Sequence, residues 1–492
     1  MRVALIWPNN IEGHNTLPLG LGYLKSNTDS SKHDIRIFDC YLLKLSADSP
    51  GLKQIIKEFD PHVVGVSCWT AQAFEALRIL RSVKSVNEDI VTLIGGVHAS
   101  AYPVKTVKHK EVDFLFQGEA ELSFPIFLEE LEKKTPDWSR VKGLTYETSS
   151  CEIIQNTSEQ EEDLDKIKYP DYDAANLEAY TKEWHSKSSI PFCRAERIAP
   201  IWITRGCPYI CQYCTAPIVN GKTIRTPSVE YVVNWVKYLY HEKKIRQINI
   251  SDDNFTFDVK YAKTVCRAII AENLKGLKFD TIVGIRQERT DPELFNLMKQ
   301  AGWETIIIAP ESGSLRTLEK MKKKMDPETI PAKVEQIKNA GLKAVGYFIV
   351  GYPGETEKDL VDTKKLILKS RFNFVFLFSF RPLPGTTIYD ELITSGELSE
   401  DSLEENTSLS TGSSERVYTT KTLKHFNLPR FVIKTYLELA LVNLHNFPFM
   451  MSFYPPKKMF ILFYGVFSAG IRKACRGYMP RAIKLDLEHQ TK

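Results

Sequence analysis

Two separate parts of the chain alternate short β-branched runs with stretches of helical periodicity, and this alternation restricts the fold more than any other feature. In the first part, residues 1 to 147, strand-like runs stand at Val3–Ile6, Ile35–Phe38, Val63–Val66, Ile90–Ile94 and Asp113–Phe116. Between them, Leu52–Phe59 and Ala71–Val86 have the apolar spacing of helices. Strands and helices that alternate in this way form parallel, doubly wound sheets. The sequence therefore predicts an α/β domain with a five-stranded sheet.

A second alternation begins at Ile198 and supplies six strand–helix units within about 190 residues. The expected strands are Ile201–Thr204, Ile245–Ile250, Lys278–Val283, Thr305–Ile308, Lys343–Val350 and Phe374–Phe380. Helices are expected at Ser228–His241, Asp258–Asn273, Pro292–Ala301, Asp326–Ala340 and Glu357–Lys369. A closed TIM-type barrel takes eight such units. The sequence predicts a partial (β/α)6 barrel that follows a flavodoxin-like first domain.

The remaining segments set the domain boundaries. We expect a linker at residues 148–195, because Gln155–Lys168 is rich in acidic residues and a Tyr- and Pro-containing stretch follows it. The barrel then takes residues 196–392, and residues 393–492 form a mostly helical region with basic and aromatic residues. From Lys421 to Lys492 there are 12 Lys or Arg and 3 Asp or Glu, which gives this segment a charge of +9. The whole chain has a net charge of +4, so the rest of it carries −5. A basic tail on an acidic body predicts an anionic surface as the tail's partner.

The composition excludes several classes of protein. With 43% hydrophobic and 26% charged residues, the chain is neither a low-complexity sequence nor a coiled coil. We find no secretory signal pattern and no uninterrupted apolar run of about 18 residues, the nearest being Met459–Ile471. Nine cysteines among 492 residues are too sparse for a disulfide framework. We therefore expect a cytoplasmic protein in which a cysteine cluster serves metal binding or catalysis.

Three of the nine cysteines, Cys207, Cys211 and Cys214, stand directly after the first expected barrel strand. Thiolates suit zinc or iron–sulfur clusters, and three of them on one short loop can hold three corners of a cuboidal cluster. A structural zinc site is the alternative, but such a site usually has a fourth Cys or His ligand nearby. The next Cys or His after Cys214 along the chain is His241. Three ligands leave one metal corner open for chemistry.

This CxxxCxxC spacing, with Tyr213 before the last cysteine, resembles the signature of the radical S-adenosylmethionine (SAM) enzymes. The similarity extends over the whole expected barrel. It implies a [4Fe–4S] cluster on the three cysteines and SAM bound at the open iron. The resemblance also assigns cofactor contacts to the acidic motif with Asp252 and Asp253, to Arg286, to Glu311 and Ser312, and to Gly351 in the fifth-strand motif.

Each of these secondary motifs has an ordinary structural explanation when it is taken singly. The two acids could stand at a helix N-terminus, and the glycine could belong to a common turn. Taken in order, each near the C-terminal end of its own strand, the motifs favour a SAM site. The charges fit independently of the resemblance, because a carboxylate and a guanidinium suit the amino and carboxylate ends of SAM.

Joined to such a barrel, the first domain resembles the cobalamin-binding domain of B12-dependent radical SAM enzymes. Ligands of open doubly wound sheets lie outside the carboxyl ends of the strands. In those loops the resemblance assigns cofactor contacts to Gly20, Ser67, Trp69, Thr70, Gly95, Gly96, His98 and Glu119. The two adjacent glycines would let the backbone approach the nucleotide tail of cobalamin closely, where a Cβ would block it.

The Asp-x-His-x-x-Gly motif, whose histidine ligates cobalt in many cobalamin proteins, is absent here. His14 lies in the first loop, but Glu12 stands where the aspartate would be needed. We therefore predict cobalamin without a histidine on cobalt, and with Trp69 as a non-ligating wall below the metal. The alternative for Trp69 is a partly buried aromatic residue at a domain interface. His98 either contacts the corrin edge or caps the segment that follows it.

The resemblance implies a cobalamin-dependent radical SAM enzyme, and we expect a methyltransferase that acts on an unactivated carbon. Such an enzyme uses one SAM to methylate cobalamin and a second to make the adenosyl radical. One alternative is a cyclase or rearrangement enzyme for a tetrapyrrole or lipid precursor, with the same cofactors and no methyl transfer. Another is a non-enzymatic cobalamin or redox sensor.

The expected partners are a small-molecule or lipid-like substrate and an electron donor such as flavodoxin or ferredoxin, with no nucleic acid. The aromatic run Met459–Phe467, which has lysines and arginines on both sides, also predicts peripheral contact with a membrane surface. The alternative for this run is a helix that packs against the mouth of the barrel.

Overall fold

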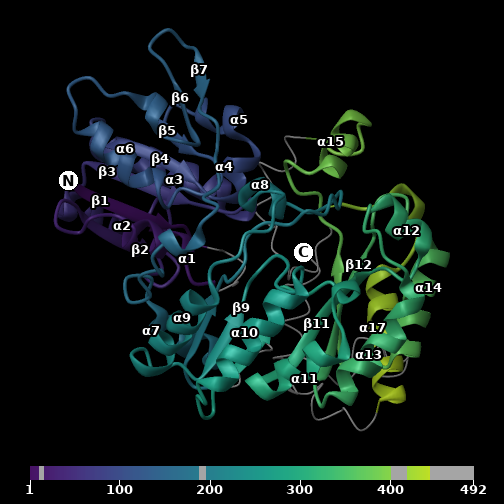
Figure 1. Ribbon diagram of the computed structural model, residues 1–492. Helices are drawn as coiled ribbons and strands as arrows, with labels where there is room; N and C mark the ends of the chain where they lie inside the picture. The colour runs from purple at the N-terminus through teal and green to yellow at the C-terminus, as the bar shows by residue number, and fades with distance from the viewer. Residues whose placement is uncertain (10–15, 188–194, 400–417, 444–492) are drawn as a thin grey trace, which may run out of the picture. The chain divides into compact units, whose positions relative to one another are not determined.

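The computed structural model describes residues 1–9, 16–187, 195–399 and 418–443. The chain divides into two units, Met1–Lys424 and His425–Lys492. The first unit contains two α/β sheets (Figure 1), and the described part of the second unit contains helix α17 (Leu428–Val442). The predicted aromatic run Met459–Phe467 and most of the basic tail lie outside the described residues.

The first sheet has seven strands in the order β2-β1-β3-β4-β5-β6-β7. They are β1 (Arg2–Trp7), β2 (Asp34–Asp39), β3 (Val63–Ser67), β4 (Val91–Gly95), β5 (Phe114–Phe116), β6 (Leu144–Glu147) and β7 (Ile153–Gln155). The first five strands pair in parallel, which confirms the predicted doubly wound layout. The last two add an antiparallel hairpin beside β5, and β7 lies beyond residue 147.

Alternating side chains of this sheet supply two cores. On β1, Val3 and Leu5 face the core that helices α1 (Leu19–Ser26) and α6 (Ser123–Leu131) cover. Ala4 and Ile6 face the other core, under α2 (Pro50–Phe59) and α3 (Ala73–Val86). A strand covered on both faces must be almost entirely apolar, and this is why β1 and β3 read as continuous hydrophobic segments, whereas the edge strand β2 carries the exposed residues Asp34 and Arg36.

The second sheet has six parallel strands in the order β13-β12-β11-β10-β9-β8, an open arc that confirms the predicted partial barrel. Its strands are β8 (Ile198–Ile201), β9 (Gln247–Ile250), β10 (Lys278–Thr281), β11 (Trp303–Glu311), β12 (Lys343–Val350) and β13 (Phe374–Ser379). The helices that follow β8 to β12 in turn include α9 (Val229–His241), α10 (Val259–Ala271), α11 (Pro292–Ala301), α13 (Ile330–Asn339) and α14 (Glu357–Ser370). Shorter helices are α4 (Val97–Ala101), α5 (Pro103–Val107), α8 (Ala216–Asn220), α12 (Leu315–Lys320) and α15 (Thr387–Thr394).

The segment that we expected to be an irregular linker contains α7 (Leu177–Lys187) and packs against both sheets. Tyr172 and Tyr180 are fully buried. The Tyr172 hydroxyl donates to the Pro200 carbonyl of β8 at 2.8 Å, and the Tyr180 hydroxyl donates to Asp39 at the end of β2 at 2.6 Å. Two buried phenols therefore tie this segment to a strand of each sheet.

We find no helix long and apolar enough to cross a membrane in the part of the chain that the structure describes.

Candidate functional site

A cavity of about 450 Å³ lies where the strand ends of the two sheets meet within the first unit. From the first sheet it is lined by residues at the ends of β1, β3, β4 and β5, and from the second by residues at the ends of β8, β9 and β10. Of the predicted cofactor contacts, those that line it are Gly20, Ser67, Trp69, Gly95, Gly96 and Glu119. Thr70 and His98 are not among the described lining residues.

The three predicted glycines of the first domain, Gly20, Gly95 and Gly96, differ in what an added Cβ atom would contact. A Cβ on Gly20 would have nothing within 4 Å, and a Cβ on Gly95 would come no closer than 3.8 Å to Phe116. Gly96 is different, because its φ is +94° and a Cβ there would lie 2.6 Å from the Cys68 carbonyl oxygen. Gly96 is therefore required by the backbone itself, whereas Gly20 and Gly95 leave open space along the cavity.

Trp69 forms part of the cavity wall together with Trp7. The two rings meet edge to face, with centroids 5.8 Å apart and an interplanar angle of 89°. Trp69 is 38% exposed although it stands at the end of a buried strand. The wall is compatible with both interpretations that the sequence left open. His98 lies on α4, with its ring 5.8 Å from that of Tyr102.

Backbone hydrogen bonds from three elements hold the cysteine loop. The Cys207 amide donates to the Gly221 carbonyl at 3.1 Å, and the Gln212 amide donates to Met321 at 3.0 Å. The Gln212 carbonyl accepts from Ile388 at 3.2 Å. The residues that directly follow α8 and α12, together with Ile388 of α15, therefore fix a loop that has no regular structure of its own.

The three thiols are half-buried and lie within electrostatic reach of one another. Burial, together with the charges of Cys211, Cys207 and Asp253, raises the pKa of Cys214 to about 12. As the side chains stand, no three His, Cys, Asp or Glu residues of the described chain are arranged to hold a metal ion. Metal binding would displace the thiol protons.

The two acids after β9 have different surroundings. Asp252 is buried and accepts hydrogen bonds from the Ile203 and Thr204 amides, both at 2.7 Å, and from the Thr204 hydroxyl at 2.8 Å. Burial raises its pKa to about 7. Asp253 accepts one bond, from the Asn220 side chain at 2.7 Å. Asp252 thus anchors the chain ahead of the cysteine loop, and Asp253 is the acid whose charge acts on the thiols.

Arg286 lies against the cysteine loop. Its guanidinium stacks on the Tyr209 ring at 3.6 Å, and Nη1 lies 3.9 Å from the Cys211 sulfur. Nη2 donates to the carbonyls of Lys323 and Lys324. The group is 8% exposed and is oriented by these contacts.

Tyr213 and Glu311 are hydrogen-bonded neighbours, and both contact Lys323, a residue that the sequence did not predict. The Tyr213 hydroxyl donates to Glu311 Oε1 at 2.9 Å, and Lys323 Nζ donates to the same oxygen at 2.9 Å. Lys323 is buried, yet it stands in the run Lys322–Lys324, which has the composition of a solvated surface. Ser312 contacts Thr363, with their hydroxyl oxygens 3.1 Å apart.

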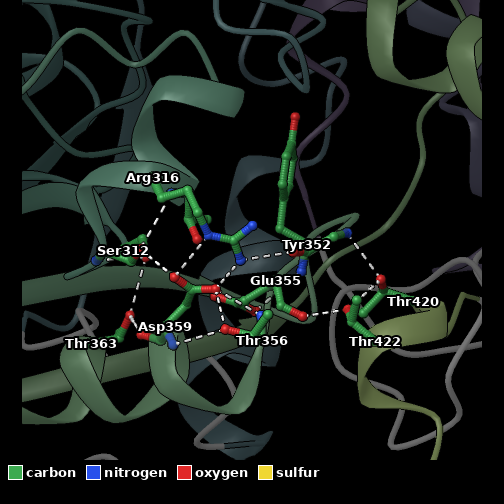
Figure 2. A network of polar contacts seen from close by, with 12 residues as sticks. Ser312, Arg316, Tyr352, Glu355, Thr356, Asp359, Thr363, Thr420 and Thr422 are labelled. Atoms are coloured by element: carbon green, nitrogen blue, oxygen red, sulfur yellow. Dashed lines mark hydrogen bonds and ion pairs between the residues drawn. The ribbon is translucent and has the colours of Figure 1, made fainter.

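A polar network holds the turn after β12 (Figure 2). Glu355 Oε2 accepts from the amides of Gly351 and Tyr352, at 2.6 and 3.3 Å. Thr422 donates to the Glu355 carbonyl, and Thr420 accepts from the Gly354 amide at 3.0 Å. The Tyr352 hydroxyl in turn donates to Gln212 at 3.4 Å. The predicted residue Gly351 therefore belongs to a turn that is linked to the cysteine loop.

Glu355 makes the stability of this turn depend on pH. Its carboxyl is buried, Oε1 has no hydrogen-bond partner among the described residues, and burial raises its pKa to about 8. The folded protein therefore holds this proton at pH values where the unfolded chain has lost it. The contribution of Glu355 to the free energy of unfolding is full at acid pH and is lost as the pH rises from about 5 to about 8.

We expect Glu355→Gln to flatten this dependence by on the order of 1–2 kcal/mol between pH 5 and pH 8. Urea unfolding at four pH values across the range measures it. Glu357→Gln, at the exposed first position of α14, is the matched control and should keep the wild-type slope. Equal slopes for the Glu355 variant and the wild-type protein would contradict the expectation.

Comparison with known proteins identifies both domains whose residues line the cavity. Residues 13–128 match the B12 binding domain family, and residues 201–367 match the radical SAM superfamily. An uncharacterized methyltransferase of Pyrococcus horikoshii is 28% identical, over 81% of this chain and 84% of its own length. The cytidylyl-2-hydroxyethylphosphonate methyltransferase of Streptomyces wedmorensis is 27% identical, over 77% and 78%. The anaerobic magnesium-protoporphyrin IX monomethyl ester cyclase of Rubrivivax gelatinosus is 25% identical, over 80% and 70%.

A solved structure shares the fold. The radical SAM methyltransferase TsrM of Kitasatospora setae, determined with cobalamin and a [4Fe–4S] cluster, superposes with a TM-score of 0.66 at 18% identity. The match covers 80% of this chain and 78% of that protein. With a B12-binding domain ahead of a radical SAM domain, and the strand ends of both around one cavity, the chain belongs to the cobalamin-dependent radical SAM enzymes.

Proposed function

We propose that this enzyme transfers a methyl group from SAM, by way of cobalamin, to an unactivated carbon of a small-molecule or lipid-like substrate. The observation that supports the proposal is the cavity that the two sheets line together. Arg205, which stands only two residues before Cys207, is one of the lining residues. A cofactor of the first domain and a cluster on the cysteine loop could therefore act on one substrate.

The residues that line the cavity suit cobalamin in their chemistry. Gly20 and Gly95 leave room along one edge, Ser67 offers a hydroxyl, and most other lining residues are apolar. No histidine stands among the described lining residues, and His14 of the first loop lies outside the described residues, so cobalt without a histidine ligand stays a prediction. We assign the wall position to Trp69, which packs on Trp7.

The residues around the cysteine loop suit the other two cofactors. We assign the cluster to Cys207, Cys211 and Cys214. For the SAM amino group we favour Asp253, because the oxygens of Asp252 already accept three hydrogen bonds. Arg286 carries the positive charge that suits a SAM carboxylate. When bound, the cluster supplies the electron that cleaves SAM, and cobalamin carries the methyl group.

An enzyme of this superfamily needs a reductant and a substrate. We propose that an electron donor such as flavodoxin or ferredoxin reduces the cluster in the cytoplasm. The match to an enzyme superfamily disfavours the non-enzymatic sensor. Cyclisation without methyl transfer remains the second candidate, since one relative that matches 80% of this chain is named a cyclase.

Product analysis decides between methyl transfer and cyclisation. Protein reconstituted anaerobically with iron, sulfide and cobalamin is incubated with reductant, a cell extract and SAM labelled in its methyl group. We expect both S-adenosylhomocysteine and 5′-deoxyadenosine, together with labelled product in the mass spectrum. Deoxyadenosine without S-adenosylhomocysteine would reject the methyltransferase and favour the cyclase. The Cys214→Ala variant serves as the control, because it should form no deoxyadenosine.

A further inference from the structure

Four buried charged side chains join the first domain to the start of the cysteine loop. We call Glu119, Glu121, Arg205 and Arg225 the interdomain charge cluster. Glu119 binds Arg225 through both of its oxygens, one of them at 2.9 Å, and also lies 3.2 Å from Arg205. Glu121 lies 2.8 Å from Arg205. All four side chains are at most 10% exposed, so two cations and two anions balance one another away from water.

The cluster stands between the two proposed cofactor sites. Glu119 and Glu121 follow β5 of the first domain. Arg205 and Arg225 pair through their backbones, with N–O distances of 3.1 and 2.9 Å, on the two sides of the cysteine loop. Arg205 and both glutamates also line the cavity. The first domain therefore holds the chain at the point where it enters and leaves the loop.

Arg225 continues this connection toward the thiols. Its guanidinium donates to the Asn220 carbonyl at 2.9 Å and to the Glu161 carbonyl at 2.7 Å. The Asn220 side chain donates to Asp253 at 2.7 Å. The next residue along, Gly221, accepts the Cys207 amide bond. Three hydrogen bonds thus lead from Glu119, through Arg225 and Asn220, to Asp253, the acid beside the thiols.

Stability alone does not explain such a cluster. Apolar side chains of similar volume often replace buried ion pairs without loss, because desolvation offsets most of their attraction. Directed charge pairs provide a fixed geometry. Apolar contacts, such as the stack of Tyr23 on Trp202 with ring centroids 6.1 Å apart, do not. The two guanidiniums admit few arrangements in which both glutamates stay paired.

We propose that the interdomain charge cluster is a positioning device that fixes the cysteine loop relative to the cobalamin-binding edge of the first domain. It thereby sets the distance between the iron–sulfur cluster and cobalt. The inference rests on the cofactor sites proposed above, but it does not depend on whether the reaction is methyl transfer or cyclisation. Glu119 is then a positioning residue, whereas the sequence predicted a cofactor contact.

Glu119→Gln tests the proposal, since it keeps the size of the side chain and leaves one positive charge uncompensated. The matched control is Glu159→Gln, whose partner Lys142 forms an exposed pair at 2.7 Å. The reconstituted protein is reduced, and pulsed EPR measures the dipolar coupling between cob(II)alamin and the reduced cluster. We expect one narrow distance distribution in wild type and control, and a broadened or shifted one in Glu119→Gln, at equal iron and cobalamin content.

Hydrogen exchange of the apoprotein gives a readout that needs no cofactor. The amides of Arg205, Cys207 and Arg225 should exchange faster in Glu119→Gln and at the wild-type rate in the control. Formation of S-adenosylhomocysteine or deoxyadenosine should fall about 10-fold to 100-fold, because small displacements of reacting groups have effects of this size. If Glu119→Gln does not fold, the double variant Glu119→Gln/Arg225→Gln replaces it in these measurements, because the double variant leaves no unpaired charge.

Two results would overturn the proposal. One is an unchanged distance distribution and unchanged amide exchange in a folded variant. The other is a loss of cobalamin with an unchanged distance in the molecules that still bind it. The second result would make Glu119 a cofactor contact. A failure to find methylated product affects neither of these measurements.

Discussion

Replacing Cys207, Cys211 and Cys214 together with alanine is expected to abolish iron binding and SAM cleavage while leaving cobalamin binding intact. Alanine offers no ligand to iron, and a [4Fe–4S] cluster is held by thiolates. The loop itself should persist, because the backbone bonds from Cys207 to Gly221 and from Gln212 to Met321 do not involve the side chains. Iron analysis, the cluster absorbance and deoxyadenosine formation measure the loss.

The control for this triple variant is Cys151→Ser, at an exposed cysteine distant in sequence from the cluster motif. It should bind as much iron as the wild-type protein. Iron content and absorbance that survive in the triple variant would mean that the cluster is held elsewhere, and the assignment of the three cysteines would be wrong.

Gly96→Ala is expected to lower the free energy of unfolding by about 2–6 kcal/mol. A residue other than glycine pays roughly 1–3 kcal/mol for the backbone conformation of Gly96, with φ +94° and ψ −171°, and forcing an extra methyl group into a packed site adds typically about 1–3 kcal/mol. Here the methyl group would lie 2.6 Å from the Cys68 carbonyl oxygen, and backbone atoms cannot move aside as a flexible side chain can. Urea unfolding of the apoprotein measures the change.

Gly20→Ala is the matched control for Gly96→Ala, because it also adds one methyl group at a glycine that lines the cavity. Nothing lies within 4 Å of its new Cβ, and alanine favours the helix that contains it by up to about 1 kcal/mol. We expect unchanged or slightly higher stability. Equal destabilisation by both substitutions would show that the left-handed backbone at Gly96 is not the cause.

The sequence predicted most elements because their signals are local. The expected helix at residues 228–241 begins with Ser228, whose side chain caps Tyr231, and Asp258 caps Tyr261 in the same way. The first barrel strand was expected at Ile201–Thr204 but lies at Ile198–Ile201. The amides of Ile203 and Thr204 explain the difference, since they donate to Asp252 instead of pairing in the sheet.

The cysteine loop could be predicted directly from the residues, because its three cysteines stand close together at a regular spacing. The other candidate residues are spread along the chain and were assigned through the resemblance. Glu119 and Arg225 are 106 residues apart, and no pattern along the chain relates them. Lys323 carries no signal either, because burial by the fold, and not its neighbours in sequence, distinguishes it from the lysines beside it.

The shared cavity has a consequence for how long the protein survives in a cell. Residues of both sheets line the cavity, so a ligand that fills it makes all of its contacts only when both sheets are folded and in place. By mass action such a ligand stabilises the folded chain, by about 2.7 kcal/mol when its free concentration is 100 times its dissociation constant. A change of that size alters the unfolded fraction on which proteases act. If cobalamin is this ligand, the supply of cobalamin would then affect the amount of folded enzyme as well as its activity.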